Sequence, residues 1–226
     1  MDKIVFTYRL TNDTGFAPCV DNGLLTLACC KGGTKTVKRG LRYFIGRFFE
    51  ENLQKDVEAY ISGIYKNKLL YIAKIDKVIT MNEYFGKSEY KDRTDQIYRI
   101  DGEILKRDKR KLKGIHDDEH SNKCDINGKY VVISKEFVFL GNKAIDLDES
   151  ILRFYPKTRG ENPKGQYSRT PAGVLTAENK NISKELYIKL RELIKEKGYT
   201  LTSGKVSEPH NPITISCGGC SSCGKE

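Results

Sequence analysis

The 226-residue sequence lacks a long hydrophobic run. No stretch approaches the roughly 18 consecutive apolar residues that a membrane-spanning helix needs. The sequence also lacks a recognisable secretory signal, because residues 1–10 contain only a short apolar stretch and alternate like a β-strand from the start. These two absences argue against a membrane-embedded or secreted protein, and we expect the protein to be cytoplasmic.

The sequence shows no cysteine pattern that suggests a disulfide framework. Its seven cysteines are an odd number, and Cys29 and Cys30 are adjacent. Disulfides belong to oxidising compartments, so we expect reduced thiols or metal ligands instead. There is also no internal repeat and no long flexible linker. We therefore predict a single domain over residues 1–204, followed by a Cys/Gly-rich tail at 205–226.

The composition is strongly basic, with 40 Lys and Arg against 30 Asp and Glu and a net charge of +10. Such a charge favours polyanionic partners, because Lys and Arg neutralise phosphates. Basic residues gather in segments 31–47, 106–113 and 156–173, and the first has six of them without an acidic residue. Each segment alone is typical of a solvated loop. Together they favour a nucleotide or nucleic acid, with DNA preferred.

Hydrophobic patterns predict a mixture of strands and helices. Strands are expected at 3–10, 24–30, 41–46, 68–80 and 130–141, and helices at 48–62 and 81–85, with a last helix from a Ser183 cap to Gly198. Thr80 and Glu83 form a capping-box pattern at the start of the second helix. Strands outnumber helices and no βαβ alternation is visible. The fold class indicated is α+β: a curved, mostly antiparallel sheet or a small β-barrel with peripheral helices.

The triplet Asp13-Thr14-Gly15 matches the active-site loop of aspartic proteases. Those enzymes need two carboxylates that share a proton, and this sequence has no second Asp-Thr-Gly triplet. Turn-forming residues, including Asn12 and Pro18, surround the triplet. The pattern therefore indicates a loop between two strands and not a protease.

Four segments together resemble a known family. They are "DTGFAPCVDNGLLTLACCK" from residue 13, "DQIYRI" from 95, "HSNKCD" from 120 and "VVISKEFVFLG" from 131. They are similar, over roughly residues 3–155, to the nucleotide modification associated domain 2 family of prokaryotes and phages. The resemblance implies a role in handling nucleotides or nucleic acid during base modification. Leu140 departs from the family pattern, which has an aromatic residue there, and this weakens a stacking role at that position.

A second resemblance concerns residues 69–85, "LLYIAKIDKVITMNEYF". They are similar to the central strand and turn of PUA-like domains of the ASCH and EVE type, which are small β-barrels that hold a base in a pocket. This likeness implies a fold but no chemistry. A base pocket needs a stacking plate, a group that reads the base edge, and cations for phosphate. Nucleotide-binding candidates are accordingly Thr14, Gly15, Phe16, Pro18, Lys31, Arg39 and Arg93, with Asp13 reading the base edge.

Several residues are candidates for catalysis. Cys30 lies beside Lys31, and a neighbouring cation favours the nucleophilic thiolate; a buried structural cysteine is the alternative. Asp13 and Asp95 are candidate carboxylates, although Asp95 also suits a turn. His116, His120 and Cys124 recur every four residues in a segment whose polar composition predicts an irregular loop. Of these, His120 lies in a family-like motif and is the candidate general base.

The C-terminal tail carries a Cys-x2-Cys-x2-Cys pattern formed by Cys217, Cys220 and Cys223. This spacing can place three sulfurs on one zinc ion or iron–sulfur cluster, with a fourth ligand from Cys19, Cys124 or a histidine. A flexible thiol-bearing tail is the alternative. Three functions thus stay open: a base-binding domain that needs no cofactor, an enzyme acting on a nucleobase or glycosidic bond, and a metalloprotein. The oligomeric state is left undetermined.

Overall fold

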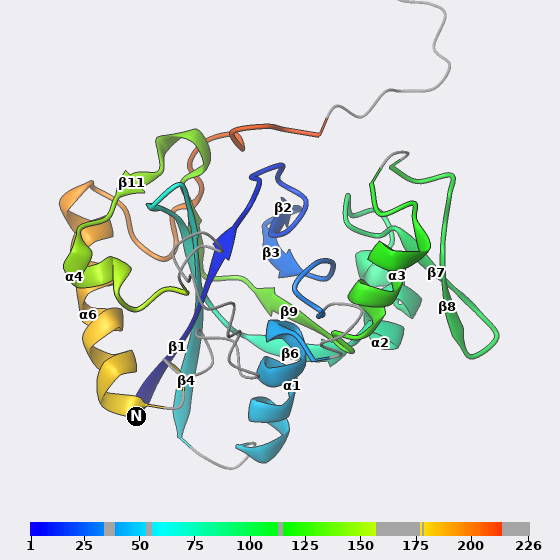
Figure 1. Ribbon diagram of the computed structural model, residues 1–226, viewed down its shortest axis with the longest axis horizontal. Coiled ribbons are helices and arrows are strands. Elements are labelled where there is room, and N and C mark those ends of the chain that lie inside the picture. Colours follow the sequence, from blue (N-terminus) through cyan, green and yellow to red (C-terminus); the bar gives the residue numbers. More distant parts are fainter. Residues whose placement is uncertain (34–38, 53–55, 113–114, 157–176, 178, 214–226) are drawn as a thin grey trace, which may run out of the picture.

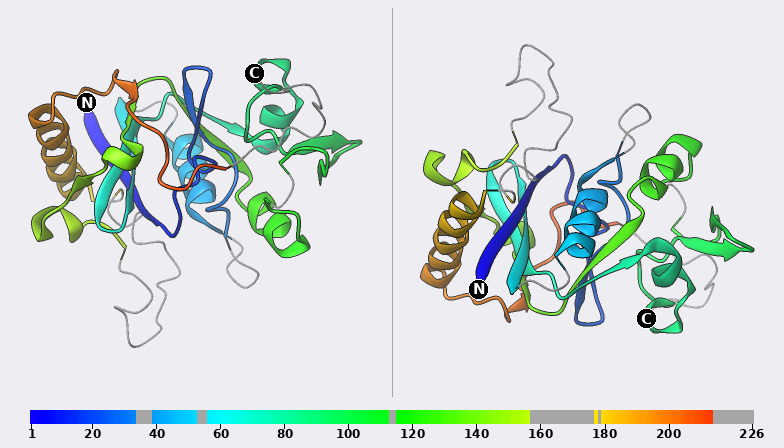
Figure 2. Two further views of the ribbon diagram at one scale, coloured as in Figure 1. Left: turned by 90° about the horizontal axis from the view of Figure 1, so that it is seen from above. Right: turned by 90° about the horizontal axis from the view of Figure 1, so that it is seen from below.

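The computed structural model describes residues 1–33, 39–52, 56–112, 115–156, 177 and 179–213. Two β-sheets pack face to face, with helix α6 on the outer side of the first sheet and a two-stranded hairpin projecting beyond the second (Figures 1 and 2). All of the predicted basic segment 156–173 except Pro156 lies outside the described residues, as does the cysteine pattern at 217–223. No helix within the described ranges combines the length and the apolar character that a membrane span requires.

The first sheet is built around the N-terminal strand. Its order is β1 (Asp2–Leu10), β4 (Val57–Tyr65), β5 (Lys68–Lys74), β10 (Phe137–Phe139) and β12 (Gly204–Lys205), with β11 (Ile145–Asp146) also on β5. β1 pairs with β4 in parallel, and β10 with β12, whereas the other pairs are antiparallel. Both faces of β1 are covered, which explains its nearly continuous apolar sequence.

The second sheet carries the candidate site at one end. It contains β2 (Cys19–Asp21), β3 (Leu24–Leu27), β9 (Tyr130–Ser134) and β6 (Lys77–Thr80) in that order, all antiparallel. Asn22 and Gly23 join β2 to β3 with φ angles of 49° and 71°, as the tight turn of a β-hairpin requires. β7 (Tyr98–Asp101) and β8 (Ile104–Arg107) form the separate projecting hairpin.

Each of the described helices except α1 begins at a side chain that accepts a hydrogen bond from an early helix amide. They are α1 (Leu41–Glu51), α2 (Met81–Gly86), α3 (Glu119–Ile126), α4 (Glu149–Leu152) and α6 (Lys180–Glu196), with 3-10 turns η1 (Ser88–Tyr90) and η2 (Gly141–Lys143). The capping box of Thr80 and Glu83 is present at α2, as predicted. Asn179, and not Ser183, caps α6, since its side chain accepts a hydrogen bond from the Ile182 amide.

Three buried clusters hold these layers together. The first lies between the two sheets and includes Phe6, Leu25 and Ile45. The second fills the space between the first sheet and α6. The third lies on the other face of the second sheet, under α2 and the loops near the hairpin. Burying such apolar surface contributes roughly 25 cal/mol per Å² and fixes the positions of the loops that carry the site.

Part of the predicted architecture is wrong. Residues 41–46 form the start of α1 and not a strand, because Leu41 and Ile45 share one buried helical face. Residues 57–62 belong to β4 and not to a helix, and the strand expected over 68–80 divides into β5 and β6. The α+β class and the predominance of antiparallel pairs are confirmed. Neither of the two sheets closes into a barrel in the described part of the chain.

Candidate active site

The chain turns sharply at Cys30 and Lys31, shortly after β3 ends. Both residues have left-handed backbone conformations, with φ angles of 58° and 50°. A non-glycine residue in this region costs on the order of 1–3 kcal/mol, and such strain is concentrated at functional sites. A comparable strained turn after a strand presents the nucleophile in many hydrolases. The half-buried Cys30 therefore occupies a position suited to a reactive side chain.

Hydrogen bonds from two directions hold this turn in place. The Cys30 amide donates to Asp125 Oδ1 at 2.6 Å. Arg42 Nε donates to the Cys30 carbonyl at 2.7 Å, and the Arg42 amide donates to the Lys31 carbonyl at 3.2 Å. These contacts offset the strain of the turn and fix the direction of its peptide groups.

Arg42 is a fully buried structural cation, 0% exposed. Besides the Cys30 carbonyl, its guanidinium donates to the carbonyls of Tyr130 and Asp125, both at 2.5 Å. A Cβ atom at Gly128 would lie 2.5 Å from Arg42 Cζ, so glycine is needed for this close approach. Arg42 thus ties the Cys30 turn to the end of α3. Although it belongs to the basic segment 31–47, its side chain faces the protein interior.

Cys30, His116 and Asp125 form a hydrogen-bonded triad. Cys30 Sγ lies 3.3 Å from His116 Nε2, and His116 Nδ1 lies 2.6 Å from Asp125 Oδ2. The Tyr98 hydroxyl donates to the same Asp125 oxygen at 2.9 Å. The His116 side chain is 21% exposed and that of Asp125 only 1%. Phe16 packs edge-on against the imidazole, with 5.4 Å between ring centroids.

Electrostatics favour the protonated form of His116. Burial alone would lower the pKa of His116, but its hydrogen bonds to Asp125 and Cys30 and the charges on these partners raise it to about 10. Both ring nitrogens then carry protons, one directed to the carboxylate and the other to the sulfur. An imidazolium next to a cysteine is the arrangement that activates catalytic thiols.

The same three side chains could also be considered as metal ligands, since their ligand atoms lie within 4.8 Å of one another. If His116 Nε2 bound an ion, Nδ1 would keep its hydrogen bond to Asp125, so Asp125 would orient the imidazole and only Cys30 and His116 would remain as ligands. Both oxygens of Asp125 already accept hydrogen bonds. The donor arrangement therefore fits a relay of hydrogen bonds better than a metal site.

Residues 11–18, which connect β1 to β2 and contain Asp13, form the Asp13 loop. This loop contacts a segment near the C-terminal end of the described residues, 206–213, which we call the strap. Asp13 Oδ2 accepts hydrogen bonds from the His210 amide and from His210 Nδ1, at 2.9 and 2.8 Å. The Asn211 and Ile213 amides donate to the carbonyls of Asp13 and Thr14. Asp13 is 0% exposed, and its Oδ1 has no hydrogen-bond partner among the described residues.

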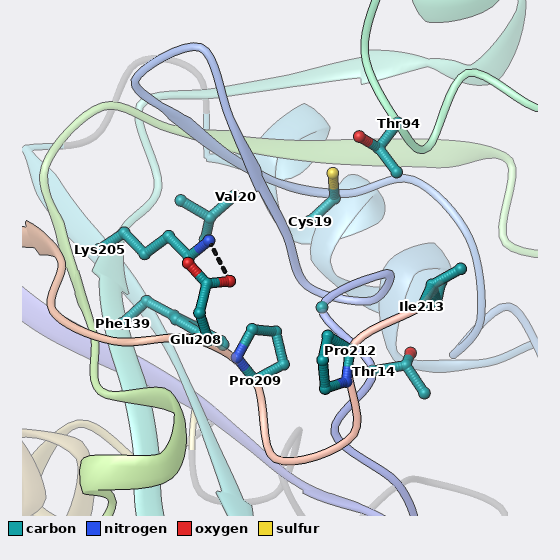
Figure 3. Close-up of a pocket in the computed structure, with 11 residues that line it drawn as sticks. Thr14, Cys19, Val20, Thr94, Phe139, Lys205, Glu208, Pro209, Pro212 and Ile213 are labelled. Carbon is teal, nitrogen blue, oxygen red and sulfur yellow. Dashed lines mark hydrogen bonds and ion pairs between the residues drawn. The ribbon is translucent and has the colours of Figure 1, made fainter. Parts of the chain in front are cut away.

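A cavity of about 230 Å³ lies between the Asp13 loop, the β2–β3 hairpin and the strap (Figure 3). Thr14 and Gly15 line it from the loop, and Pro209 and Pro212 from the strap. Gly15 has a φ of 74°, and a Cβ there would lie 2.5 Å from the Pro209 ring. At one end of the cavity, Lys205 pairs with Glu208 at 2.7 Å. The predicted nucleotide-binding residues Thr14 and Gly15 thus reach a cavity.

Asp95 and Arg93 lie in a closed network beneath β3. Asp95 accepts hydrogen bonds from Thr26 Oγ1 at 2.5 Å and from the Tyr84 hydroxyl at 2.6 Å. Arg93 donates to Tyr84 and Thr26, and its Nε lies 3.6 Å from Asp95 Oδ1. Burial raises the pKa of Asp95, which Arg93 and the hydrogen bonds partly oppose. Because both side chains are buried and hydrogen-bonded to protein groups, Asp95 and Arg93 form a structural network.

The other predicted site residues are spread over the molecule. Phe16 and Pro18 are buried. Lys31 points inward, with Nζ 3.0 Å from the Arg9 carbonyl, and burial lowers its pKa. Arg39 is exposed and lies over the ring of Tyr43. His120 belongs to α3, so the irregular loop predicted for its segment is partly wrong. The tail cysteines Cys217, Cys220 and Cys223 lie outside the described residues, and the metal site expected there stays a prediction.

The sequence indicates Cys30 as a candidate nucleophile but does not indicate its partners. The only pattern that involves His116 in the sequence is its spacing from His120; in the structure it lies in the turn before α3 with a φ of 50°. Asp125 stands ninety-five positions after Cys30, and only the tertiary fold brings them together. His210 lies in a segment without a motif. The scarcity of histidine, three residues in all, was the one signal that could have directed attention to His116 and His210.

The fold and the site define an α+β protein with two packed sheets and a cysteine–histidine–aspartate triad at the end of one of them. The family model of nucleotide modification associated domain 2 matches residues 1–170, and the chain belongs to this family. The match includes the triad and the Asp13 loop, but not His210. No curated protein and no solved structure matches the chain.

Proposed function

We propose that this protein is a nucleotide-modification enzyme in which Cys30 is the nucleophile. The observation that carries the proposal is the triad, with Sγ 3.3 Å from His116 Nε2 and His116 Nδ1 2.6 Å from Asp125. A structural cysteine needs neither a polarised imidazole nor a strained turn. Membership of the nucleotide modification associated family supports a nucleotide or nucleic acid as the substrate.

Each member of the triad has a distinct role in this proposal. Cys30 Sγ attacks an electrophilic carbon of the substrate, and His116 holds the proton that the thiol releases. Asp125 orients the imidazole and stabilises its positive charge. Tyr98 holds the carboxylate through its hydroxyl, and Arg42 holds the backbone at Cys30 and Asp125. The last two are positioning residues.

The cavity beside the Asp13 loop is proposed to hold the base. Its volume of about 230 Å³ lies just below the range of roughly 300–1,000 Å³ of pockets for drug-sized ligands, as suits a single heterocycle. Pro209 and Pro212 offer flat apolar surfaces, and Thr14 can read polar groups. Phe16, two residues after Thr14, contacts His116. This continuity supports a substrate that extends from the cavity toward Cys30.

Thiol reactivity gives the first test. Iodoacetamide labelling followed by peptide mass spectrometry is expected to modify Cys30 faster than any other cysteine near pH 7. In His116→Gln, the Cys30 labelling rate should fall at least about tenfold, because the adjacent cation is lost. Asn122→Ala, which alters another Tyr98 contact in α3, is the matched control and should keep the parent rate. Equal labelling in parent and His116→Gln would contradict the proposal.

Product formation gives the second test. The protein is incubated with DNA and nucleotides that carry modified or ordinary bases, and the nucleosides are then analysed by mass spectrometry. The parent should change the mass of at least one nucleoside, whereas Cys30→Ala should bind the same nucleic acid without changing it. Binding should weaken steeply with salt if phosphates contribute. Binding without any mass change in the parent would favour a binding domain over an enzyme.

A further inference from the structure

The turn that presents Cys30 also sets the direction of the peptide groups that follow it. The Cys30 carbonyl accepts from the Arg42 side chain, and the Lys31 carbonyl accepts from the Arg42 amide. Both peptide bonds are trans. In a trans peptide the N–H points opposite to the C=O. The Lys31 N–H therefore points away from the Arg42 guanidinium, and the Gly32 N–H points away from the Arg42 amide.

These two N–H groups are unused within the described part of the chain, where neither donates a hydrogen bond. The Cys30 amide itself is unavailable, since Asp125 Oδ1 accepts it. Successive backbone N–H groups in a turn can form a concave anion site. The Lys31 N–H directly follows the nucleophile, which is the position of an oxyanion donor in strand-to-helix nucleophile turns.

Surrounding contacts make this pair rigid. The Lys31 side chain turns inward, with Nζ 3.0 Å from the Arg9 carbonyl and 5.1 Å from the Tyr8 ring centre. At Gly32, a Cβ atom would lie 2.0 Å from the Cys124 carbonyl oxygen, so only glycine allows the turn to pack against α3. Preorganised donors of this kind stabilise developing negative charge without further reorganisation.

We propose that the Lys31 and Gly32 N–H groups form an oxyanion hole and that the triad removes acyl groups from acylated nucleotides. This inference rests on the proposed function and names its substrate class: a base or sugar that carries an amide-linked or ester-linked acyl group. An oxyanion develops when a nucleophile adds to a carbonyl carbon, so a donor pair beside Cys30 specifies carbonyl chemistry.

The reaction proceeds in two balanced steps. The Cys30 thiolate adds to the acyl carbon, and the oxygen takes the negative charge facing the two N–H groups. The tetrahedral intermediate collapses, the bond to the nucleotide nitrogen or oxygen breaks, and the leaving atom takes its proton from His116 Nε2. Water then attacks the thioester and gives a proton to His116, and the thiolate leaves. In the net reaction, water hydrolyses the acyl-nucleotide to a carboxylic acid and the free nucleotide.

Backbone esters test this proposal in the full-length protein. Replacing Lys31 by its α-hydroxy analogue, or Gly32 by glycolic acid, removes one N–H and leaves the side chain unchanged. The matched control is glycolic acid at Gly102, which lies in the β7–β8 turn with a φ of 63°. For each protein, three rates are measured: Cys30 alkylation by iodoacetamide, Cys30 acetylation by p-nitrophenyl acetate, and hydrolysis of N4-acetyl-2′-deoxycytidine monophosphate.

The expected result is a selective loss. Each ester at position 31 or 32 should slow acetylation and hydrolysis by about 100- to 1000-fold, as for removal of one oxyanion donor, while alkylation stays unchanged. The Gly102 ester should match the parent in all three rates. Acetylation unaffected by either ester, or no acetylation of a Cys30 that alkylates rapidly, would overturn the acyl-transfer inference alone. Slow alkylation of the parent, independent of His116, would instead overturn the proposed function.

Discussion

Replacing Arg42 by methionine should destabilise the protein more than any comparable change on the same helix. Methionine keeps much of the side-chain volume but removes the three guanidinium donors that reach the carbonyls of Cys30, Tyr130 and Asp125. A hydrogen bond from a charged donor contributes about 1.5–3 kcal/mol, and the contributions are not additive. Because the buried carbonyls would lose their partner, we expect a loss of about 3–5 kcal/mol in unfolding free energy.

Urea denaturation followed by circular dichroism measures this difference. The control is Arg47→Met, since Arg47 lies on the exposed side of α1 and, among the described residues, forms ion pairs with Glu50 and Glu51. Such surface pairs contribute about 0–1 kcal/mol, so the control should stay near the parent. If Arg42→Met loses less than about 1 kcal/mol, then water or neighbouring groups satisfy those carbonyls and the assigned role of Arg42 is wrong.

Two further predictions concern pH and the strap. The pKa of His116 is raised to about 10 from 6.5, so its contribution to stability is complete below about pH 6.5 and is lost as the pH rises through 10. Unfolding free energy should therefore fall more between pH 7 and pH 10 in the parent than in His116→Gln; parallel profiles would contradict this assignment. Asp13→Asn weakens the bonds to His210, so tryptic cleavage after Lys205 should accelerate, with Asp146→Asn, an exposed partner of Lys68, as the control that should not change. Cleavage at the parent rate in Asp13→Asn would show that the backbone bonds alone hold the strap.

The sequence correctly predicted helix boundaries that depend on interactions between residues close together in the chain. The box of Thr80 and Glu83 predicted the start of α2, because capping involves residues three apart. The pattern over residues 41–62 failed, because β4 is fixed by its pairing with β1 on one side and β5 on the other, and both partners lie outside that segment. No local signal reports a partner that lies more than fifty residues away.

The same limit applies to the candidate site: features within one short segment were predictable, and contacts between distant segments were not. The Asp13 loop and Cys30 were recognisable from turn residues and a family-like motif. Their partners His210 and His116 were not, since each contact joins distant segments. The charge pattern of residues 31–47 suggested a basic surface, but two of its cations point into the interior. Lys31 and Arg42 donate hydrogen bonds to backbone carbonyls there. Net charge describes the whole chain and does not say which cations reach solvent.

The family match ends at residue 170, yet residues after that point complete the packing of the first sheet and of the Asp13 loop. Helix α6 covers apolar residues of the first sheet such as Val5 and Ile72, and His210 supplies the partner of a buried carboxylate. A protein cut at the family boundary would expose that apolar face and leave Asp13 without its hydrogen bonds to His210. For expression or domain-exchange work, the cooperative unit is therefore the longer segment through residue 213, and shorter pieces are expected to aggregate.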